Sequence, residues 1–401
     1  MREKVKKALE GLGIGTHDLE YSLNNAVNWV FSSGINNMSG KPKLHGSINS
    51  WYDCDVKVYP YVYTEIAGYA ITFYMYLYNC LNEEQYLERA EIVADWIKSQ
   101  AMEDTTSEIK FRYYYHLDEF TPKHSYAFDT GIVLGGFTNL YLVNNKDTYG
   151  NTAKELAYWL IHKMQKSNGA FNCFYDLEEE IRLNSPDVWS KHSGPYHSKI
   201  AASLIRTTLF CNDGSIEQAA RKFCDWAVEQ QEPNGRFLSK TVDRTTITHP
   251  HCYACEGLLY VGFKLDEGKY IDSAVRGIQW LLTSQTDDGY ISAEFRNNKF
   301  LDYVRCDAHA QTIRIIVTAV RKGMMDEKYM SHIPLLIKRL LEFQCSSTVS
   351  AESGGFYYQR HKDDSFQRHI NSWATMFAIQ ALGLTIDYLD KKPLIDMDYL
   401  L

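Results

Sequence analysis

The sequence predicts an all-α chain folded as an (α/α)6 toroid, a closed ring of six helical hairpins. Three observations favour this fold: a phrase that recurs about every 60 residues, an alternation of apolar and amphipathic segments, and a high tyrosine content. Self-similarity at a fixed period is typical of repeat architectures, in which each repeat is one supersecondary unit.

The recurring phrase is an apolar helix end followed by a glutamine and, in most copies, by a glycine and an aromatic residue. Its glutamines lie 65, 66, 54 and 59 residues apart and are Gln100, Gln165, Gln231, Gln285 and Gln344. Trp29 precedes Trp96 by 67 residues and indicates an earlier copy. Six units therefore run through residues 1–401 without a linker, which predicts a single domain.

The second unit shows what each repeat contains. Residues 63–81 are apolar nearly all round, which predicts a buried inner helix. Residues 82–100 carry apolar side chains at three- and four-residue spacing, which predicts a half-exposed outer helix with Asn82 as its N-cap. An open superhelix of helical pairs is the alternative, and the apolar first helices favour closure.

The later units follow the same order. Inner helices are expected to start near Ala127, Tyr196, His251, Asp307 and Asn371, and outer helices to end at Trp159, Trp226, Trp280 and Leu341. In the recurring phrase, Gly169, Gly235 and Gly289 suit a left-handed turn, which a Cβ would penalise.

Composition narrows the class of partner. The 29 tyrosines suggest an aromatic-walled cleft, because a buried Tyr needs a partner for its hydroxyl. A net charge of −8 without a basic stripe argues against nucleic acid. No apolar run is long enough to insert into a membrane, and the N-terminus lacks an apolar signal core. Nine cysteines without framework spacing are typical of free thiols, so we expect a cytoplasmic protein.

Polar residues at the starts of the inner helices are the candidates for function, since burying them unpaired is costly. Every unit places such residues at the same point of its repeat, where a toroid opens into a funnel. Those singled out for the site are Tyr63, Glu65, Asp129, His192, Tyr196, His197, Lys199, His251, Tyr253, Glu256, Arg305, Asp307, His309 and Trp373.

The segment 247–262 is the richest of them. Tyr253 and Glu256 share a helix face, and with His251 they form a candidate proton-transfer set. The structural alternative is that the histidines cap the helix and Glu256 pairs with a basic neighbour. Zinc is a weaker possibility, because Cys252 and Cys255 would both lie within a helix. We therefore expect neither a metal nor another cofactor.

The segment 184–201 combines aromatic and basic side chains and feeds the third inner helix. Trp189, His192, Tyr196 and Lys199 suit an acidic sugar, which needs a flat apolar face and a cation. A packed loop with satisfied histidines is the alternative. The three tyrosines at 113–115 could line the cleft or form a strand of a hairpin lid.

The repeat resembles those of α/α toroid proteins. Terpene cyclases need an Asp-x-Asp-Asp acid, and Asp53-Cys54-Asp55-Val56 lacks its last aspartate; prenyltransferases need a zinc set. The carbohydrate-active branch fits better. Residues 250–256, Pro-His-Cys-Tyr-Ala-Cys-Glu, are similar to the Pro-His-Met-His-x-x-Glu of N-acylglucosamine 2-epimerase-like enzymes, with Tyr253 in place of the second histidine.

A second resemblance is shorter. Residues 128–131, Phe-Asp-Thr-Gly, are similar to the His-Asp-x-Gly of unsaturated glucuronyl hydrolases. Tyrosine-rich toroids also include glucuronyl C5-epimerases and uronate lyases, so the resemblance implies sugar chemistry that uses Tyr, His and Glu.

The sequence therefore predicts an enzyme acting on an acidic sugar or glycan in surface-polysaccharide metabolism, by proton transfer that gives epimerisation or elimination. Tyr253, His251 or His197 would be the base or acid, and Lys199 or Arg305 would neutralise the developing charge. One alternative is a glycoside hydrolase with two carboxylates from Asp129, Glu256 and Asp307. The other is a toroid that binds a glycan or a protein without catalysis.

Overall fold

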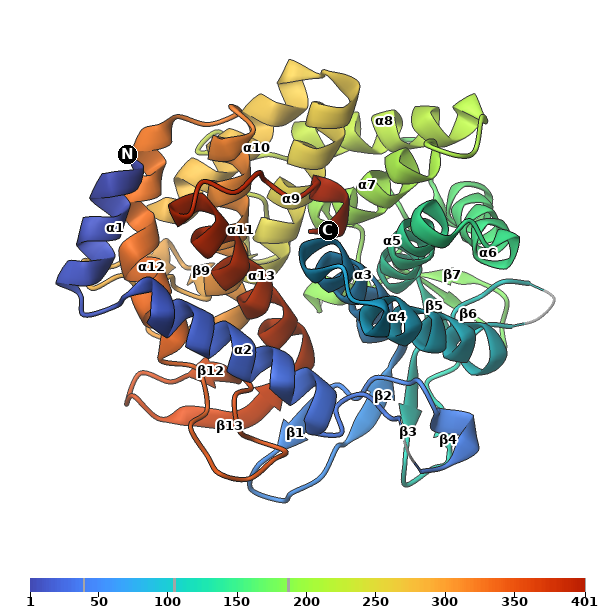
Figure 1. Cartoon of the computed structure of the whole chain (residues 1–401). Coiled ribbons are helices and arrows are strands. Elements are labelled where there is room, and N and C mark those ends of the chain that lie inside the picture. Colours follow the sequence, from blue (N-terminus) through green and yellow to red (C-terminus); the bar gives the residue numbers. More distant parts are fainter. Residues whose placement is uncertain (39, 104–105, 186–187, 401) are drawn as a thin grey trace.

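The computed structural model describes residues 1–38, 40–103, 106–185 and 188–400, and its helices form a ring (Figure 1). Six largely buried helices make the inner layer: α3 (Thr64–Leu81), α5 (Ala127–Asn144), α7 (Ser198–Thr207), α9 (Thr248–Leu265), α11 (Cys306–Arg321) and α13 (Ser372–Leu389). The outer layer is α4 (Glu84–Trp96), α6 (Asp147–Tyr158), α8 (Gly214–Glu229), α10 (Gly268–Leu282), α12 (Ile333–Leu341) and α2 (Thr16–Ser32). The predicted toroid of six hairpins is confirmed.

The sixth hairpin joins the two ends of the chain. Each inner helix packs on the next, and α13 packs on both α3 and α2, so the ring is closed. α2 is the outer helix that carries Trp29, as the earlier copy of the phrase predicted. The short helix α1 (Arg2–Gly11) lies against α12 and α13. Because closure uses both ends, it favours a single domain, which stays a prediction.

The recurring glutamine fastens one outer helix to the next. The Gln231 side chain donates to the backbone oxygen of Gly235 at 2.7 Å and to that of Ser273, in α10, at 2.8 Å. Gln344 repeats this geometry with the oxygens of Gly354 and Ser22, in α2, at 3.0 and 2.8 Å. Gln165 makes the same pair of contacts, with the oxygens of Gly169 and of Ala219 in α8, so the glutamine joins neighbouring hairpins at three of its five positions.

Two structural constraints favour glycine in the recurring phrase: a positive φ and close contact with the next outer helix. Gly235 has a φ of +95°, and a Cβ there would lie 2.5 Å from the backbone oxygen of Arg276 in α10. Gly169 and Gly289 also have positive φ and press on α8 and α12, as expected for turns that a Cβ would penalise. At Gly354, where a Cβ would meet the Asn25 oxygen at 2.3 Å, the same contact closes the ring onto α2.

The helix boundaries agree with the expected ones except at one cap. Asn82, expected as the N-cap of α4, instead ends α3 in a left-handed conformation with a φ of +54°, and Glu83 occupies the N-cap position. An Asn between two helices fits both roles, and here its tolerance of positive φ decides.

Short antiparallel strands gather where the inner helices begin. They form a four-stranded sheet and three three-stranded sheets: β1 (Trp51–Asp53), β13 (Phe366–Asn371), β12 (Tyr357–Arg360) and β11 (Val304–Arg305); β10 (Lys299–Phe300), β9 (Glu294–Arg296) and β8 (Thr246–Ile247); β2 (Tyr61–Tyr63), β3 (Arg112–Tyr114) and β4 (Glu119–Phe120); β5 (His124–Tyr126), β6 (Phe174–Asp176) and β7 (Arg182–Leu183). The tyrosines at 113 and 114 belong to such a hairpin, as the lid alternative proposed.

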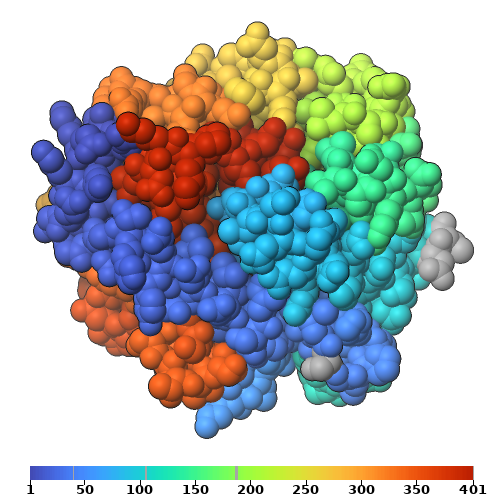
Figure 2. Space-filling model, in the orientation of Figure 1, coloured from blue at the N-terminus to red at the C-terminus, as the bar shows by residue number. Residues whose placement is uncertain are grey.

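The C-terminal segment covers the other end of the ring. It lies near the middle of the face shown in Figure 2. Asp398, in the turn η7 (Met397–Tyr399), accepts from Tyr260 and pairs with Lys264 at 3.1 Å and with the buried Arg206 at 3.6 Å. The side chain of Asn139 donates to the backbone oxygen of Asp398, and that of Gln380 donates to the backbone oxygen of Tyr399. This segment therefore ties together inner helices α5, α7, α9 and α13.

Within the described ranges, no helix is both long and apolar enough to cross a membrane. All nine cysteines are free thiols, and all but Cys80 are buried.

Candidate functional site

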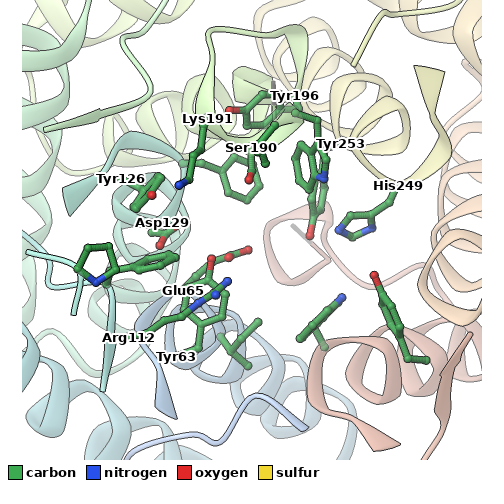
Figure 3. A pocket seen from close by; sticks show the side chains of 18 of the residues that line it. Tyr63, Glu65, Arg112, Tyr126, Asp129, Ser190, Lys191, Tyr196, His249 and Tyr253 are labelled. Carbon is green, nitrogen blue, oxygen red and sulfur yellow. The ribbon is translucent and has the colours of Figure 1, made fainter. Parts of the chain in front are cut away.

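A cavity of about 590 Å³ opens where the inner helices begin, walled by helix starts, strands and the loop before α7 (Figure 3). Its lining is Tyr63, Glu65, Ile66, Phe111, Arg112, Tyr114, Pro122, Tyr126, Phe128, Asp129, Val188, Trp189, Ser190, Lys191, Tyr196, His249, Tyr253, Arg305, Tyr358 and Trp373. Six tyrosines and two tryptophans among these give the aromatic walls that composition suggested. Such walls suit the flat apolar faces of sugar rings.

Two carboxyl groups share one side of the cavity. Glu65 and Asp129 stand in the first turns of the adjacent helices α3 and α5, and they are 9% and 4% exposed. Burial raises the pKa of Glu65 to about 7, although Tyr63 and Arg112 oppose the shift. Burial, and then the nearby Glu65, raise the pKa of Asp129 well above its usual range. At least one proton is therefore held by this pair near neutral pH.

A histidine lies on the opposite side of the cavity (Figure 3). His249, in the first turn of α9, has its Nδ1 2.7 Å from Oε1 of Gln311 and 3.3 Å from Oδ2 of Asp307. Burial lowers the pKa of His249 to about 4, so the ring is neutral at pH 7. Because both partners accept, Nδ1 carries the proton, and Nε2 keeps a free lone pair for the cavity.

Asp307 organises this side of the cavity from behind. It is fully buried and does not line the cavity. Nε and Nη2 of Arg305 donate to its carboxylate, as does Nε1 of Trp373 at 3.1 Å. Burial opposes ionisation, but Arg305 and His249 hold the pKa of Asp307 below its usual value. The side chains of Arg305, Trp373 and His249 are thus held in place by the carboxylate of Asp307.

The structure brings together nine of the predicted site residues. Those that line the cavity are Tyr63, Glu65, Asp129, Trp189, Tyr196, Tyr253, Arg305 and Trp373 directly, with Asp307 behind them. The Tyr253 ring lies 4.4 Å from that of His249. Burial raises the pKa of Tyr253 well above its usual range, so its hydroxyl stays protonated and can donate a hydrogen bond. Pro186 and Asp187 of the loop 184–201 lie outside the described residues.

Glu256 and Lys199 do not reach the cavity, which corrects the placement expected from their repeat positions. Glu256 is 4% exposed, and its carboxylate lies 3.1 Å from Nζ of Lys199 and 3.3 Å from Nη1 of Arg314. Burial, despite the neighbouring Glu256, lowers the pKa of Lys199 to about 8. The three side chains form a buried ion cluster, as the structural alternative proposed for Glu256.

Four predicted histidines also lie off the cavity. His251 accepts from the Phe237 amide at Nδ1, so its Nε2 donates to the Gly277 oxygen. His309 accepts from the Ile291 amide and donates to the Arg305 oxygen. His192 contacts the backbone oxygens of Ser193 and Ser239, and His197 is fully buried among aromatic rings. His251 and His309 serve the turn of the recurring phrase, which explains their regular spacing.

Three cavity residues from strands and a turn were not predicted from the sequence. Arg112 comes from β3, Lys191 from the turn η4 (Trp189–Lys191), and Tyr358 from β12. Their only sequence signal was the clustering of aromatic and basic residues, as in the stretch 111–115.

Within the described residues, no group of three or more His, Cys, Asp or Glu side chains is arranged to hold a metal ion. What the cavity does present is a neutral imidazole facing a carboxyl pair that retains a proton. This combination can remove a proton from one side of a bound molecule and supply one from the other.

No protein-family model and no curated protein sequence matches this chain. Solved structures do match. The cellobiose 2-epimerase from Bacillus thermoamylovorans B4167 shares 12% identity over 92% of this chain and 98% of its own, with a TM-score of 0.75. A D-mannose isomerase shares 11% identity over 93% of this chain and 97% of its own, with a TM-score of 0.74. The unsaturated glucuronyl hydrolase from Bacillus sp. GL1 shares 13% identity over 91% of this chain and 96% of its own, with a TM-score of 0.65.

Identities this low establish the fold alone. They confirm the resemblance to α/α toroid proteins over nearly the whole chain, including the carbohydrate-active members named from the sequence. The chain has the fold of an α/α toroid.

Proposed function

We propose that this protein is a carbohydrate-active enzyme that transfers a proton at a carbon of a bound saccharide, giving epimerisation, isomerisation or elimination. The observation that carries the proposal is the fixed tautomer of His249, whose Nε2 lone pair faces an aromatic-walled cavity. The structural similarity to a cellobiose 2-epimerase and a D-mannose isomerase supports it.

In this mechanism His249 is the base, and the Glu65–Asp129 pair supplies a proton on the other side. Asp307 stabilises the imidazolium that forms, because its carboxylate accepts from Nδ1. Arg305 and the Tyr253 hydroxyl, which also line the cavity, can stabilise negative charge that develops on a sugar oxygen. His251 and His197, the other bases considered from sequence, have no access to this cavity.

The test is solvent isotope exchange. The protein is incubated in D2O with neutral sugars, disaccharides and uronic acids, and deuterium at a ring or C2 carbon is followed by NMR. Exchange is expected with at least one class, and His249→Gln should reduce it roughly 100-fold or more, the scale of a positioned proton-transfer group. His17→Gln, on the exposed side of α2, is the matched control.

Glycoside hydrolysis is the second candidate, and the Glu65–Asp129 pair favours it. Of the carboxylates expected for a hydrolase, Asp129 lines the cavity, while Glu256 and Asp307 are held in ion pairs outside it. The same incubations test hydrolysis. If reducing ends are released without deuterium incorporation, and this release is lost in Glu65→Gln and Asp129→Asn, hydrolysis replaces the proton-transfer proposal.

A cytoplasmic location and a role in surface-polysaccharide metabolism complete the proposal. Nine free cysteines support the first, since disulfides are rare in a reducing compartment.

A further inference from the structure

Two cations, Arg112 and Lys191, face the cavity without an ion-pair contact to a carboxylate among the described residues. Arg112 lies over the rings of Tyr63 and Phe111, each 4.3 Å from its guanidinium carbon, and its Nε is buried without a hydrogen-bond partner. Among the described residues, no carboxylate forms an ion pair with Arg112 or with Lys191. The aromatic rings hold the guanidinium in place but leave its charge uncompensated.

The other cations near the site are paired. Arg305 is neutralised by Asp307, and Lys199 and Arg314 by Glu256. The basic residue that sequence analysis assigned to an acidic sugar, Lys199, is therefore unavailable for that role. Lys191 stands eight residues earlier in the chain, beside Trp189 and Ser190 on the cavity wall.

The neighbouring acids do not cancel this charge at or below neutral pH. Burial raises the pKa of Glu65 to about 7 and raises that of Asp129 further, so the pair carries at most about one negative charge there. A protonated carboxyl group can also donate to an anion. Removing a cation from water without a partner is expensive, and a bound anion would offset that cost.

We propose that Arg112 and Lys191 bind the carboxylate of a uronic-acid unit, which makes the substrate an acidic saccharide. The inference rests on the proposed saccharide-binding cavity and deepens it. Figure 3 shows both cationic groups on the side of the cavity that carries Asp129, facing His249 across the open space. A planar guanidinium matches the geometry of a carboxylate. Because Glu65 and Asp129 flank the site, a uronate with one negative charge is repelled less than a phosphate group with nearly two.

The experiment is a calorimetric titration of the intact chain near pH 6 with three ligands of one sugar skeleton: glucuronate, glucose and glucose 6-phosphate. Glucuronate is expected to bind tightest. Lys191→Gln should weaken glucuronate binding roughly tenfold and leave glucose binding unchanged, as expected for one charge-assisted contact. Lys7→Gln, which removes the same charge from an exposed site on α1, should change neither.

Arg112→Gln should weaken glucuronate binding at least as much as Lys191→Gln does. If Arg112→Gln fails to fold, Lys191→Gln keeps the test valid, because Lys191 lies in a half-buried surface turn. Equal affinity for glucose and glucuronate, unchanged binding in Lys191→Gln, or a preference for glucose 6-phosphate would each overturn the proposal. His249→Gln separates it from the proposed function: this variant should still bind glucuronate, whether or not the wild type exchanges deuterium.

Discussion

The carboxylate of Asp307 lies 3.3 Å from Nδ1 of His249, and it also receives hydrogen bonds from Arg305 and Trp373. It thereby fixes which imidazole nitrogen is free, although it does not touch the cavity itself. We expect Asp307→Asn to lower deuterium exchange roughly 100-fold or more, as when the orienting carboxylate of a histidine is lost.

A merely structural role would lower stability alone. The decisive measurements are therefore kcat and its pH profile in folded Asp307→Asn, where the inflection assigned to His249 should move. Asp302→Asn, at an exposed ion pair with Lys362, is the control. Wild-type turnover in Asp307→Asn would show that His249 needs no orienting carboxylate.

The pKa of Glu65 gives stability a pH dependence with a definite sign. Because its folded-state pKa is about 7 against 4.5 unfolded, the folded state holds more protons between these values, and the shift costs stability as pH rises through that window. Glu65→Gln should remove this cost. The difference in Tm between Glu65→Gln and the wild type should therefore increase from pH 5 to pH 8. The corresponding gain in the free energy of unfolding is about 3 kcal/mol at most. A difference in Tm that is constant with pH would contradict the shifted pKa.

Gly235 should tolerate a methyl group worse than an isolated turn glycine. Gly323 also has a positive φ, +72°, but a Cβ there would meet nothing within 4 Å. Both Gly→Ala changes carry backbone strain, and only Gly235→Ala also pushes α10 away. We expect Gly235→Ala to lose roughly 1–3 kcal/mol more in denaturant unfolding, the range for overpacking. Equal losses would mean that the outer helices do not pack as closely as described.

Asp398 should matter for stability far more than its neighbour Asp396. Asp398→Asn leaves the buried Arg206 without its carboxylate, and it should cost on the order of 3 kcal/mol. Among the described residues, Asp396 forms an ion pair only with Lys264, at 3.4 Å, and it is 51% exposed. Its side chain also accepts from the Asp398 amide, which an asparagine oxygen can do as well, so Asp396→Asn should change the free energy of unfolding by less than about 0.5 kcal/mol. Chemical denaturation of both variants provides the comparison. Similar small effects would show that the segment does not hold the ring.

The fold could be predicted from the sequence because one physical contact recurs in it. The glutamine of the phrase bonds to the next outer helix at Gln165, Gln231 and Gln344, and the glycine after it presses on that helix, so the period of the phrase reports the architecture. The same regularity misled the choice of site residues. His251 and His309 recur because they serve that turn, whereas function is expected where repeats differ.

The second obstacle to predicting the site was that the partners of its residues lie far away in the sequence. Glu256 looked like a buried carboxylate in need of a role, and its partner Arg314 lies in the next inner helix, which only the folded ring brings close. Glu65 and Asp129 were recognised from their helix starts. Arg112 was missed because β3 enters the cavity through its pairing with β2, a long-range contact that no local pattern records.

Closing the ring with the two ends of the chain has a consequence for biosynthesis. Helix α2 leaves the ribosome early, yet Gln344, which bonds to Ser22, follows 322 residues later. Until α13 emerges, α2 lacks its main packing partner, although Phe31 already contacts Tyr74 of α3 and Tyr86 of α4, and the rest of its apolar side stays exposed on the nascent chain. The wall formed by Tyr358 and Trp373 arrives last as well. A truncated translation product would therefore have most of the helices and an incomplete cavity, so the proposed activity would require chains synthesised through this final hairpin.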